Sequence, residues 1–177
     1  MSEIRSKKMK TFQFMMKTKI RNLYLVASEL GLQSVSNKKQ KSEMVQKLNP
    51  KDPIQKILLE ASRQLVEYLD GKRKIFQLPL DLVGTSFQKQ VWQALLKIPF
   101  GTTNSYKDIA QRIKNPKAVR AVGSANGKNP LCIIVPCHRV IAHDGSLGGY
   151  SGGLDFKKQL LELEASGREL KNTISRS

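Results

Sequence analysis

The sequence predicts an α+β fold in two domains: a small N-terminal antiparallel sheet with one helix, then a mostly helical C-terminal domain that holds a helix-turn-helix and a candidate active-site cysteine. Segments rich in β-branched and aromatic residues precede one long amphipathic helix in the first half. Short helical segments separated by turn signals fill the second half. A chain of 177 residues can form two small cores, and we place the domains at residues 1–82 and 83–177.

The first domain begins with a polar, basic segment, residues 1–10, which we expect to be a flexible arm. Two strands are predicted at Phe12–Lys19 and Asn22–Ser28 because alternating, β-branched or aromatic residues fill both. Gly31 turns the chain into a third strand at Leu32–Val35. These strands form an antiparallel meander, followed by a lysine-rich loop.

One amphipathic helix completes the first domain. Pro53 stands in its first turn with Asp52 as the N-cap, and Gly71 ends it. Apolar residues recur between these points at steps of three and four, which is typical of a helix that packs on a sheet. Residues 76–80 form either a further strand or the linker to the second domain.

The second domain is predicted to be mainly helical. Ser86 is the expected N-cap of a helix from Phe87 to about Lys97. Ser105 and Asp108 form a capping box for a shorter helix.

A further helix is predicted over residues 115–125, and with the helix before it forms a helix-turn-helix candidate. Lys117, Arg120 and Ser124 fall at three- and four-residue spacing, so they form one polar face. This face is either a DNA-binding surface or an ordinary solvated helix face.

The segment around Cys137 carries the strongest chemical signal. Leu131–Val135 is a short apolar run expected to be a buried strand, and Pro136 ends it. We therefore expect Cys137 just beyond a strand end, with a thiol that reagents can reach. A small buried hydrophobe is the alternative role of any cysteine, and Cys132 within the apolar run fits that role.

Two charged or titratable residues follow the cysteine. His138 is adjacent to Cys137, and Arg139 adds a fixed positive charge that favours a thiolate nearby. Successive side chains of a strand point to opposite faces, so a direct Cys-His pair cannot form on one. A base next to Cys137 must act at a turn or through a water.

The C-terminal part contains a short strand at Val140–Ala142, a glycine-rich stretch at residues 148–153 and a last helix. Glycines let the backbone approach a ligand closely, so the stretch is either a substrate loop or a flexible linker. Asp155 is the expected N-cap of the last helix, which holds Glu164 near its end. We expect residues after 166 to be frayed.

Composition limits the function. Lys and Arg total 31 against 14 Asp and Glu, and the net charge of +17 favours DNA as the partner. The 2 cysteines stand five positions apart in one predicted strand and turn, which makes a disulfide geometrically awkward and favours an intracellular compartment. The Cys and His residues lack zinc-ligand spacing, so we predict no metal site. No membrane span or signal peptide is evident.

The stretch Pro136–Val140, followed by Gly149–Leu154, resembles the active-site signature of the O6-alkylguanine-DNA alkyltransferases, the methylated-DNA–protein-cysteine methyltransferases. The likeness covers about residues 84–165, and the first half of the chain matches only loosely. Further matching segments are Phe100-Gly101, Ser105-Tyr106, Asn115–Gly123 and Asn129-Pro130. The resemblance implies direct repair of double-stranded DNA: irreversible, single-turnover transfer of the alkyl group of O6-alkylguanine to the protein's own cysteine. It implies no cofactor, and we expect a monomer.

The resemblance also implies roles for single residues. Cys137 is the nucleophile, and His138 and Glu164 form with a water the relay that removes its proton. The target nucleotide must be flipped out of the duplex. Arg120 fills the gap that it leaves, on a recognition helix that lies in the minor groove.

The substrate pocket is assigned in the same way. The hydroxyl of Tyr106 faces N3 of the purine, and the backbone N–H of Ser151 faces O6. The backbone carbonyls of Cys137 and Val140 accept from the exocyclic amine. Tyr150 lines the alkyl pocket. Asn129 braces the turn between the helix-turn-helix and the active site.

Two other functions compete with this interpretation. Some proteins of this fold lack the cysteine and bind lesions without repairing them, as alkyltransferase-like proteins, whereas this chain has Cys137. A cysteine hydrolase would show multiple turnover, but it needs an oxyanion hole and an acyl pocket, and the sequence identifies neither.

Overall fold

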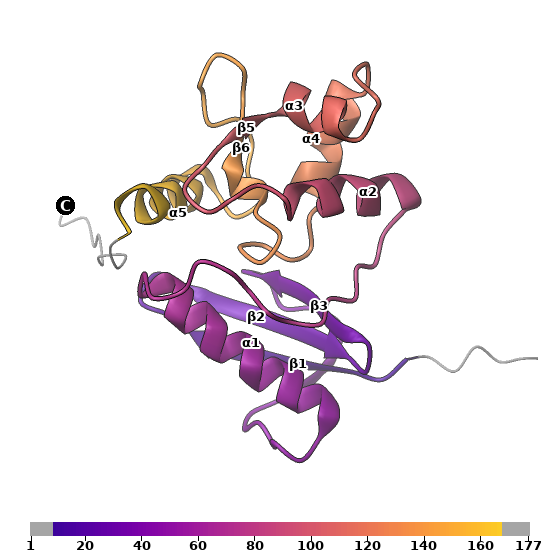
Figure 1. Cartoon of the computed structure of the whole chain (residues 1–177). Helices are drawn as coiled ribbons and strands as arrows, with labels where there is room; N and C mark the ends of the chain where they lie inside the picture. Colours follow the sequence, from indigo (N-terminus) through magenta and orange to yellow (C-terminus); the bar gives the residue numbers. More distant parts are fainter. Residues whose placement is uncertain (1–8, 168–177) are drawn as a thin grey trace, which may run out of the picture.

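The computed structural model describes residues 9–167, so most of the expected N-terminal arm and the expected frayed end lie outside the described residues. The first part contains strands β1 (Thr11–Lys17), β2 (Asn22–Ser28), β3 (Gly31–Ser36) and β4 (Glu43–Val45), and helix α1 (Pro53–Leu69). The four strands form one sheet in the order β3-β2-β1-β4. Helix α1 lies across this sheet (Figure 1). The three predicted strands are confirmed.

Strand β4 was not predicted. It pairs in parallel with β1 at the sheet edge, Phe12 opposite Glu43, so the sheet is mixed rather than a simple meander. The side chain of Gln13 fixes the loop that leads there: it accepts from the backbone N–H of Gln40 at 2.7 Å and donates to the Gln40 carbonyl at 3.1 Å. A three-residue strand held by such distant contacts leaves no periodic signal in the sequence.

Helix α1 begins and ends as predicted. The Asp52 side chain accepts from the backbone N–H groups of Ile54 and Gln55, and Gly71 adopts a φ of 72° after the C-cap. Its apolar face is buried against β1, β2 and β3. Tyr68, near the end of the helix, is fully buried and reaches the second part of the chain.

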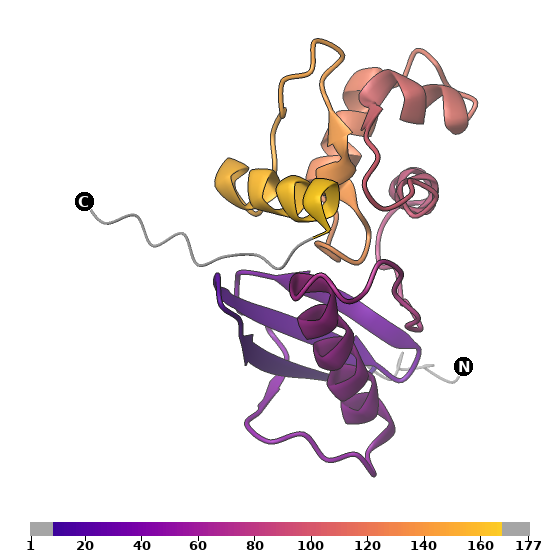
Figure 2. The same cartoon turned by 60° about the vertical axis from the view of Figure 1, so that its left-hand side comes forward.

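The second part contains α2 (Ser86–Leu95), β5 (Asn104–Ser105), α3 (Tyr106–Arg112), α4 (Val119–Gly127), a 3-10 turn (Cys137–Arg139), β6 (Val140–Ile141) and α5 (Leu154–Ser166). Its helices gather above the sheet and α1 (Figure 2). The α+β architecture with a mostly helical second part is therefore confirmed. Among residues 9–167, no helix has both the length and the apolar character needed to cross a bilayer.

Three predicted helix starts are wrong. The N-cap of α2 is Thr85, because its side chain and that of Gln88 form the capping box. Helix α4 begins only at Val119, so Lys117 lies in the turn before it. Gly153 precedes α5, which places Asp155 inside its first turn, where a carboxylate is favoured by the helix dipole. The capping box of Ser105 and Asp108 is confirmed.

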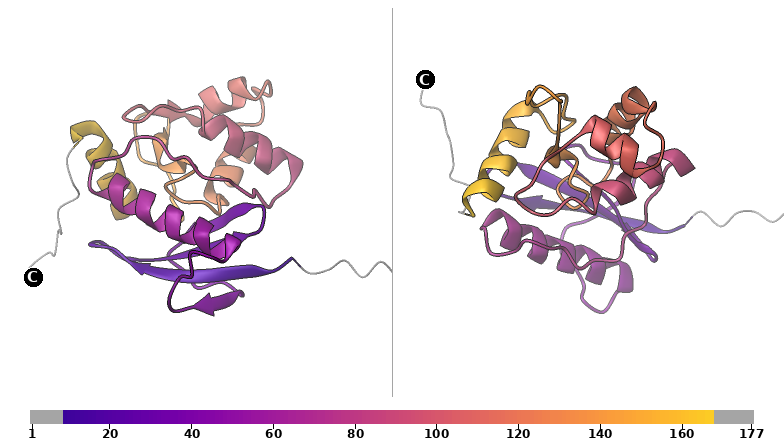
Figure 3. Two further views of the ribbon diagram at one scale, coloured as in Figure 1. Left: turned by 60° about the horizontal axis from the view of Figure 1, so that its bottom comes forward. Right: turned by 45° about the horizontal axis from the view of Figure 1, so that its top comes forward.

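The predicted strand at Leu131–Val135 is also wrong. Leu131 forms one isolated bridge to Val35 of β3, and Ile133 then adopts a left-handed φ of 73°. The N–H of Val135 donates back to the Leu131 carbonyl at 2.9 Å, so the segment coils instead of extending. These buried turns lie between the helices and the sheet (Figure 3), which explains their apolar composition.

Candidate active site

Cys137 begins the 3-10 turn that follows these coils. Its side chain is 1% exposed, so the expectation of a reachable thiol is wrong for this structure. Asn129 donates a hydrogen bond to Sγ of Cys137 at 3.0 Å. His138 and Arg139 of the same turn are buried too. The chain thus places three reactive or charged side chains in its interior within three consecutive residues.

The surroundings of Cys137 favour the neutral thiol. The neighbouring thiol of Cys132 and burial together raise the pKa of Cys137 well above its ordinary value, while Asn129 and Lys157 oppose them. The expected role of Arg139 needs correction, because its guanidinium is committed to Glu164 and to the Ile98 carbonyl. A base is therefore needed before Cys137 can act as a nucleophile.

Glu164 on α5 is the centre of a buried polar network. It receives hydrogen bonds from four sources: Arg139 Nη2 at 2.9 Å and Nε at 2.9 Å, Tyr68 Oη at 2.5 Å, the Gly101 N–H at 3.0 Å, and His138 Nε2 at 2.8 Å. Burial raises the pKa of Glu164, but the hydrogen bonds from His138 and Arg139 outweigh it and bring the pKa to about 2. Glu164 is a carboxylate at any physiological pH.

This network fixes the state of His138. An ionised carboxylate can only accept, so the proton shared with Glu164 belongs to His138 Nε2. Burial lowers the pKa of His138 although Glu164 raises it, which favours the neutral ring. Nδ1 then keeps its lone pair, and among the described residues it has no hydrogen-bond partner. His138 is a held, neutral base with one free acceptor atom.

Sequence reasoning missed two buried members of this site. Tyr68 looks like an ordinary apolar position of α1, yet its hydroxyl donates to Glu164 and lies 3.3 Å from His138 Nε2. Lys157 of α5 is fully buried and donates to the carbonyls of Val140, at 2.7 Å, and Leu147. Burial lowers the pKa of Lys157. The only sequence feature that could have pointed to this role is a lysine within a helix rich in leucine.

Two of the predicted substrate residues, Tyr106 and Tyr150, lie near Cys137, whereas Ser151 lies beside Cys132. Tyr106 begins α3, is half-buried, and has a raised pKa because of burial and the nearby Cys137. Gly148 has a φ of 65°, and a Cβ there would lie 2.8 Å from the Tyr106 hydroxyl. The glycine-rich stretch thus packs closely on Tyr106. The hydroxyl of Tyr150 is buried, and it lies close enough to Cys132 to lower the pKa of that thiol.

The predicted DNA-binding residues lie apart from this centre. Arg120 and Ser124 are exposed on α4, and Lys117 is exposed in the turn before it. The opposite face of α4 reaches the site: Asn126 donates to the Cys137 carbonyl at 3.4 Å, and the Ala125 carbonyl accepts from Trp92 Nε1 at 2.8 Å. One short helix therefore joins a basic outer surface to the buried cysteine.

Comparison with known families accounts for both parts of the chain. Residues 12–82 match the model described as 6-O-methylguanine DNA methyltransferase, ribonuclease-like domain. Residues 86–166 match the model described as 6-O-methylguanine DNA methyltransferase, DNA binding domain. The chain belongs to the 6-O-methylguanine DNA methyltransferase family.

Individual relatives agree with this membership. A Methanosarcina barkeri methylated-DNA–protein-cysteine methyltransferase is 56% identical over 109 residues, 62% of this chain and 69% of the relative. The inducible Bacillus subtilis methylated-DNA–protein-cysteine methyltransferase is 56% identical over 101 residues, 57% of this chain and 56% of that protein. The crystal structure of Mycobacterium tuberculosis OGT in complex with DNA is 41% identical, with a TM-score of 0.79, over 89% of this chain and 95% of that one.

Proposed function

We propose that this methyltransferase repairs O6-alkylguanine in double-stranded DNA by taking the alkyl group onto Sγ of Cys137. Family membership supports the reaction class, DNA repair by alkyl transfer to a protein cysteine. The single observation that carries the assignment to this residue is the buried arrangement of Cys137, His138 and Glu164, with His138 held at 2.8 Å from the carboxylate. Nucleophile, base and orienting carboxylate are the parts that an activated thiol requires.

The transfer begins with removal of the thiol proton from Cys137. Nδ1 of His138 takes the thiol proton of Cys137 through a bridging water, while Glu164 holds the ring and stabilises the imidazolium that forms. The thiolate then attacks the alkyl carbon, so a C–S bond forms as the bond between that carbon and O6 breaks. The electron pair leaves with the guanine, and the Tyr106 hydroxyl stabilises the charge that develops on the base.

Because Cys137 is buried, the alkylated guanine must move to the thiol. A stacked guanine cannot reach a side chain that is 1% exposed, so the nucleotide must leave the duplex at a cost of about a few kcal/mol. We assign Arg120 to the vacated stack because its planar cation is weakly hydrated and stands on the exposed face of α4. Lys117 and Ser124 are assigned to the backbone beside it.

The remaining pocket roles stay proposals. Tyr150 lines the space for the alkyl group, and the backbone of Ser151 meets O6. The carbonyl of Val140 already accepts from Lys157, but its second lone pair remains for the exocyclic amine. Asn129 keeps the thiol in place by its bond to Sγ. Within this scheme residues 83–177 form the domain that binds DNA and reacts, and residues 1–82 support it.

The product is a thioether on Cys137, which cellular thiols do not reduce, so each molecule acts once. No step of the scheme draws on a metal or an organic cofactor. Binding of lesions without repair is the weaker candidate, because it would give no role to Cys137 or to the buried pair of His138 and Glu164. We place the protein inside the cell, where its DNA substrate is.

Intact mass spectrometry tests this function. Incubation with duplex DNA containing O6-methylguanine is expected to add one methyl group, about 14 Da, per protein molecule and to restore guanine in the DNA. The number of repaired bases should equal the number of protein molecules. Repair that continues after that point, or repair without a gain in protein mass, would refute the proposal.

A further inference from the structure

The second cysteine of the chain lies against the first. Because residues 131–137 coil, Cys132 and Cys137 are neighbours in space, and the contact between their thiols is the largest influence on the pKa of each. An extended strand would have separated them by roughly 16 Å at about 3.3 Å per residue. The strand on which the expectation of an awkward disulfide rested is therefore absent.

The backbone geometry that brings the thiols together is tightly fixed. The N–H of Ile134 donates to the Cys132 carbonyl at 2.9 Å, and the N–H of Cys137 donates to the Val135 carbonyl at 2.8 Å. Asn129 spans the coil, bonding both the Val135 carbonyl and Sγ of Cys137. A disulfide forms without large backbone movement only where two cysteines already lie close together, and this coil places Cys132 and Cys137 near each other.

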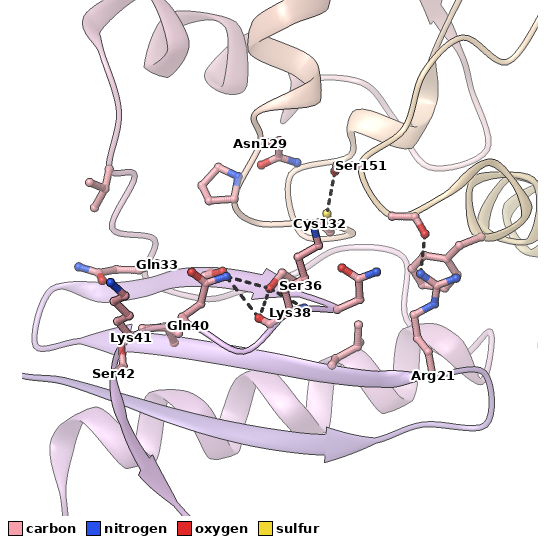
Figure 4. A pocket seen from close by; sticks show the side chains of 18 residues that line it. Arg21, Gln33, Ser36, Lys38, Gln40, Lys41, Ser42, Asn129, Cys132 and Ser151 are labelled. Atoms are coloured by element: carbon pink, nitrogen blue, oxygen red, sulfur yellow. Dashed lines mark hydrogen bonds between the residues drawn. The ribbon is translucent and has the colours of Figure 1, made fainter.

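The two thiols differ in access. Cys132 lines a pocket of about 500 Å³ between the sheet and the loops of the second part, whereas Cys137 does not. Figure 4 shows Cys132 on the wall of this pocket beside Ser151, whose Oγ lies 3.7 Å from the Cys132 sulfur. A small reagent that enters the pocket meets Cys132 first.

The two thiols also differ in how readily they ionise. Arg21 of the pocket wall donates to the Gly152 carbonyl at 2.5 Å and stacks on Phe156, with its guanidinium carbon 3.9 Å from the ring centroid. The Cys137 thiol, the Ser151 hydroxyl and the charge of Arg21 lower the pKa of Cys132 against the effect of burial. Cys132 is thus the thiol of the pair that ionises first, and the thiolate is the form that oxidants attack.

We propose that Cys132 is an oxidation site that closes a reversible disulfide with Cys137 and so masks the alkyl acceptor. The Cys132 thiolate attacks a peroxide, its sulfur is oxidised to a sulfenic acid, and the O–O bond breaks with release of water after protonation. The Cys137 thiol then displaces the hydroxyl group from that sulfur, which forms the S–S bond and releases a second water. A thiol reductant restores both thiols.

This inference rests on the proposed role of Cys137, but its test does not need DNA. The chain has only 2 cysteines, so an intramolecular disulfide can join only this pair. The reduced full-length protein is treated with hydrogen peroxide and its intact mass is measured. We expect a loss of about 2 Da, together with loss of benzyl transfer from free O6-benzylguanine, and recovery of both after addition of dithiothreitol.

Variants separate the two sulfurs. Cys132→Ser and Cys132→Val, which differ in polarity at a position outside the proposed reaction path, should keep benzyl transfer when reduced. Neither should show the lighter species or the dithiothreitol-dependent recovery. Cys137→Ser should accumulate a Cys132 sulfenic acid that dimedone traps.

The results decide between clear alternatives. If the wild type gains oxygen without the 2 Da loss, or if both Cys132 variants lose and regain transfer as the wild type does, the inference is wrong. If the disulfide forms but the reduced protein never accepts an alkyl group, the proposed function fails while the thiol pair stands.

Discussion

The side-chain nitrogen of Asn129 lies 3.0 Å from Sγ of Cys137. The same nitrogen donates to the Val135 carbonyl at 2.8 Å, and Asn129 Oδ1 accepts from the Leu131 N–H at 3.0 Å. One buried amide therefore closes the coil and holds the proposed nucleophile at its end. Few other side chains could make all three contacts, because they require a donor and an acceptor on one short planar group.

Replacing Asn129 by alanine should loosen this coil. Three buried hydrogen bonds disappear and their partners are left unpaired, so we expect the free energy of unfolding to fall by about 2–4 kcal/mol. Urea unfolding measures the loss. Asn126→Ala is the matched control, since Asn126 is also buried but its contact with the Cys137 carbonyl is a longer 3.4 Å. An equal loss in both variants would show that Asn129 has no special part in the coil.

Glu164 should make the free energy of unfolding depend on pH in the acidic range. Its pKa of about 2 in the folded protein is below the ordinary 4.5, so the ionised form stabilises the fold. That stabilisation, on the order of 3 kcal/mol, is complete above the ordinary pKa and disappears as the pH falls from about 5 toward 2. Glu164→Gln should be less stable at neutral pH and should show a flatter pH dependence in the same window.

Glu60 provides the control for this experiment. Its hydrogen bonds from Arg63 and Gln64 lower its pKa to about 2 as well, but its side chain is 41% exposed. Solvent screening weakens such a pair, so Glu60→Gln should change thermal stability at neutral pH little. Equal effects of the two substitutions would show that burial of the Glu164 network does not determine its contribution to stability.

The sequence predicted those parts of the fold that local patterns determine. Strands β1 to β3, the caps of α1 and the capping box of α3 follow from periodicity and from side chains within a few residues. The coil after Asn129 does not, because a left-handed φ at Ile133, a β-branched residue, is chosen by distant contacts against its own preference. A short apolar run that is buried on all sides looks the same whether it extends or coils.

The residues of the candidate site also fall into a predicted group and a group that the sequence did not predict. Cys137, His138 and Glu164 were selected through a resemblance. The structure joins the side chains of His138 and Glu164, and Cys137 begins the turn that holds His138. Tyr68 and the true partner of Arg139 could not be found, because their contacts cross 96 and 25 positions of the chain. The neighbouring thiols of Cys132 and Cys137 were hidden by the mistaken strand.

Arg120 should affect the reaction rate only when the alkylated guanine starts inside a duplex. Arg120→Ala is expected to slow repair of O6-methylguanine in duplex DNA far more than reaction with free O6-benzylguanine, which needs no flipping. Single-turnover rates on both substrates give the comparison. Lys56→Ala, an exposed change on α1, serves as the control and should leave the ratio of the two rates unchanged. Equal losses on both substrates in Arg120→Ala would remove its assigned role.

The basic surface should produce a strong dependence of DNA affinity on salt. The logarithm of the affinity for undamaged duplex should fall linearly with the logarithm of salt concentration, by about 0.9 per neutralised phosphate. Lys117→Ala should reduce that slope by up to about one unit if Lys117 contacts one phosphate. Lys56→Ala should not, because α1 lies away from α3 and α4 (Figure 1). The opposite result would move the DNA-binding face to the first part of the chain.

Locating the transferred methyl group tests the central claim most directly. Trypsin should release residues 129–139 as one peptide that contains both cysteines, so fragmentation of this peptide after reaction with O6-methylguanine duplex assigns the added mass to one sulfur. The account predicts a methyl group on Cys137, and a Cys137→Ser protein that still binds DNA but gains no mass. A methyl group on Cys132, or an unmodified peptide from protein that has repaired its substrate, would contradict it.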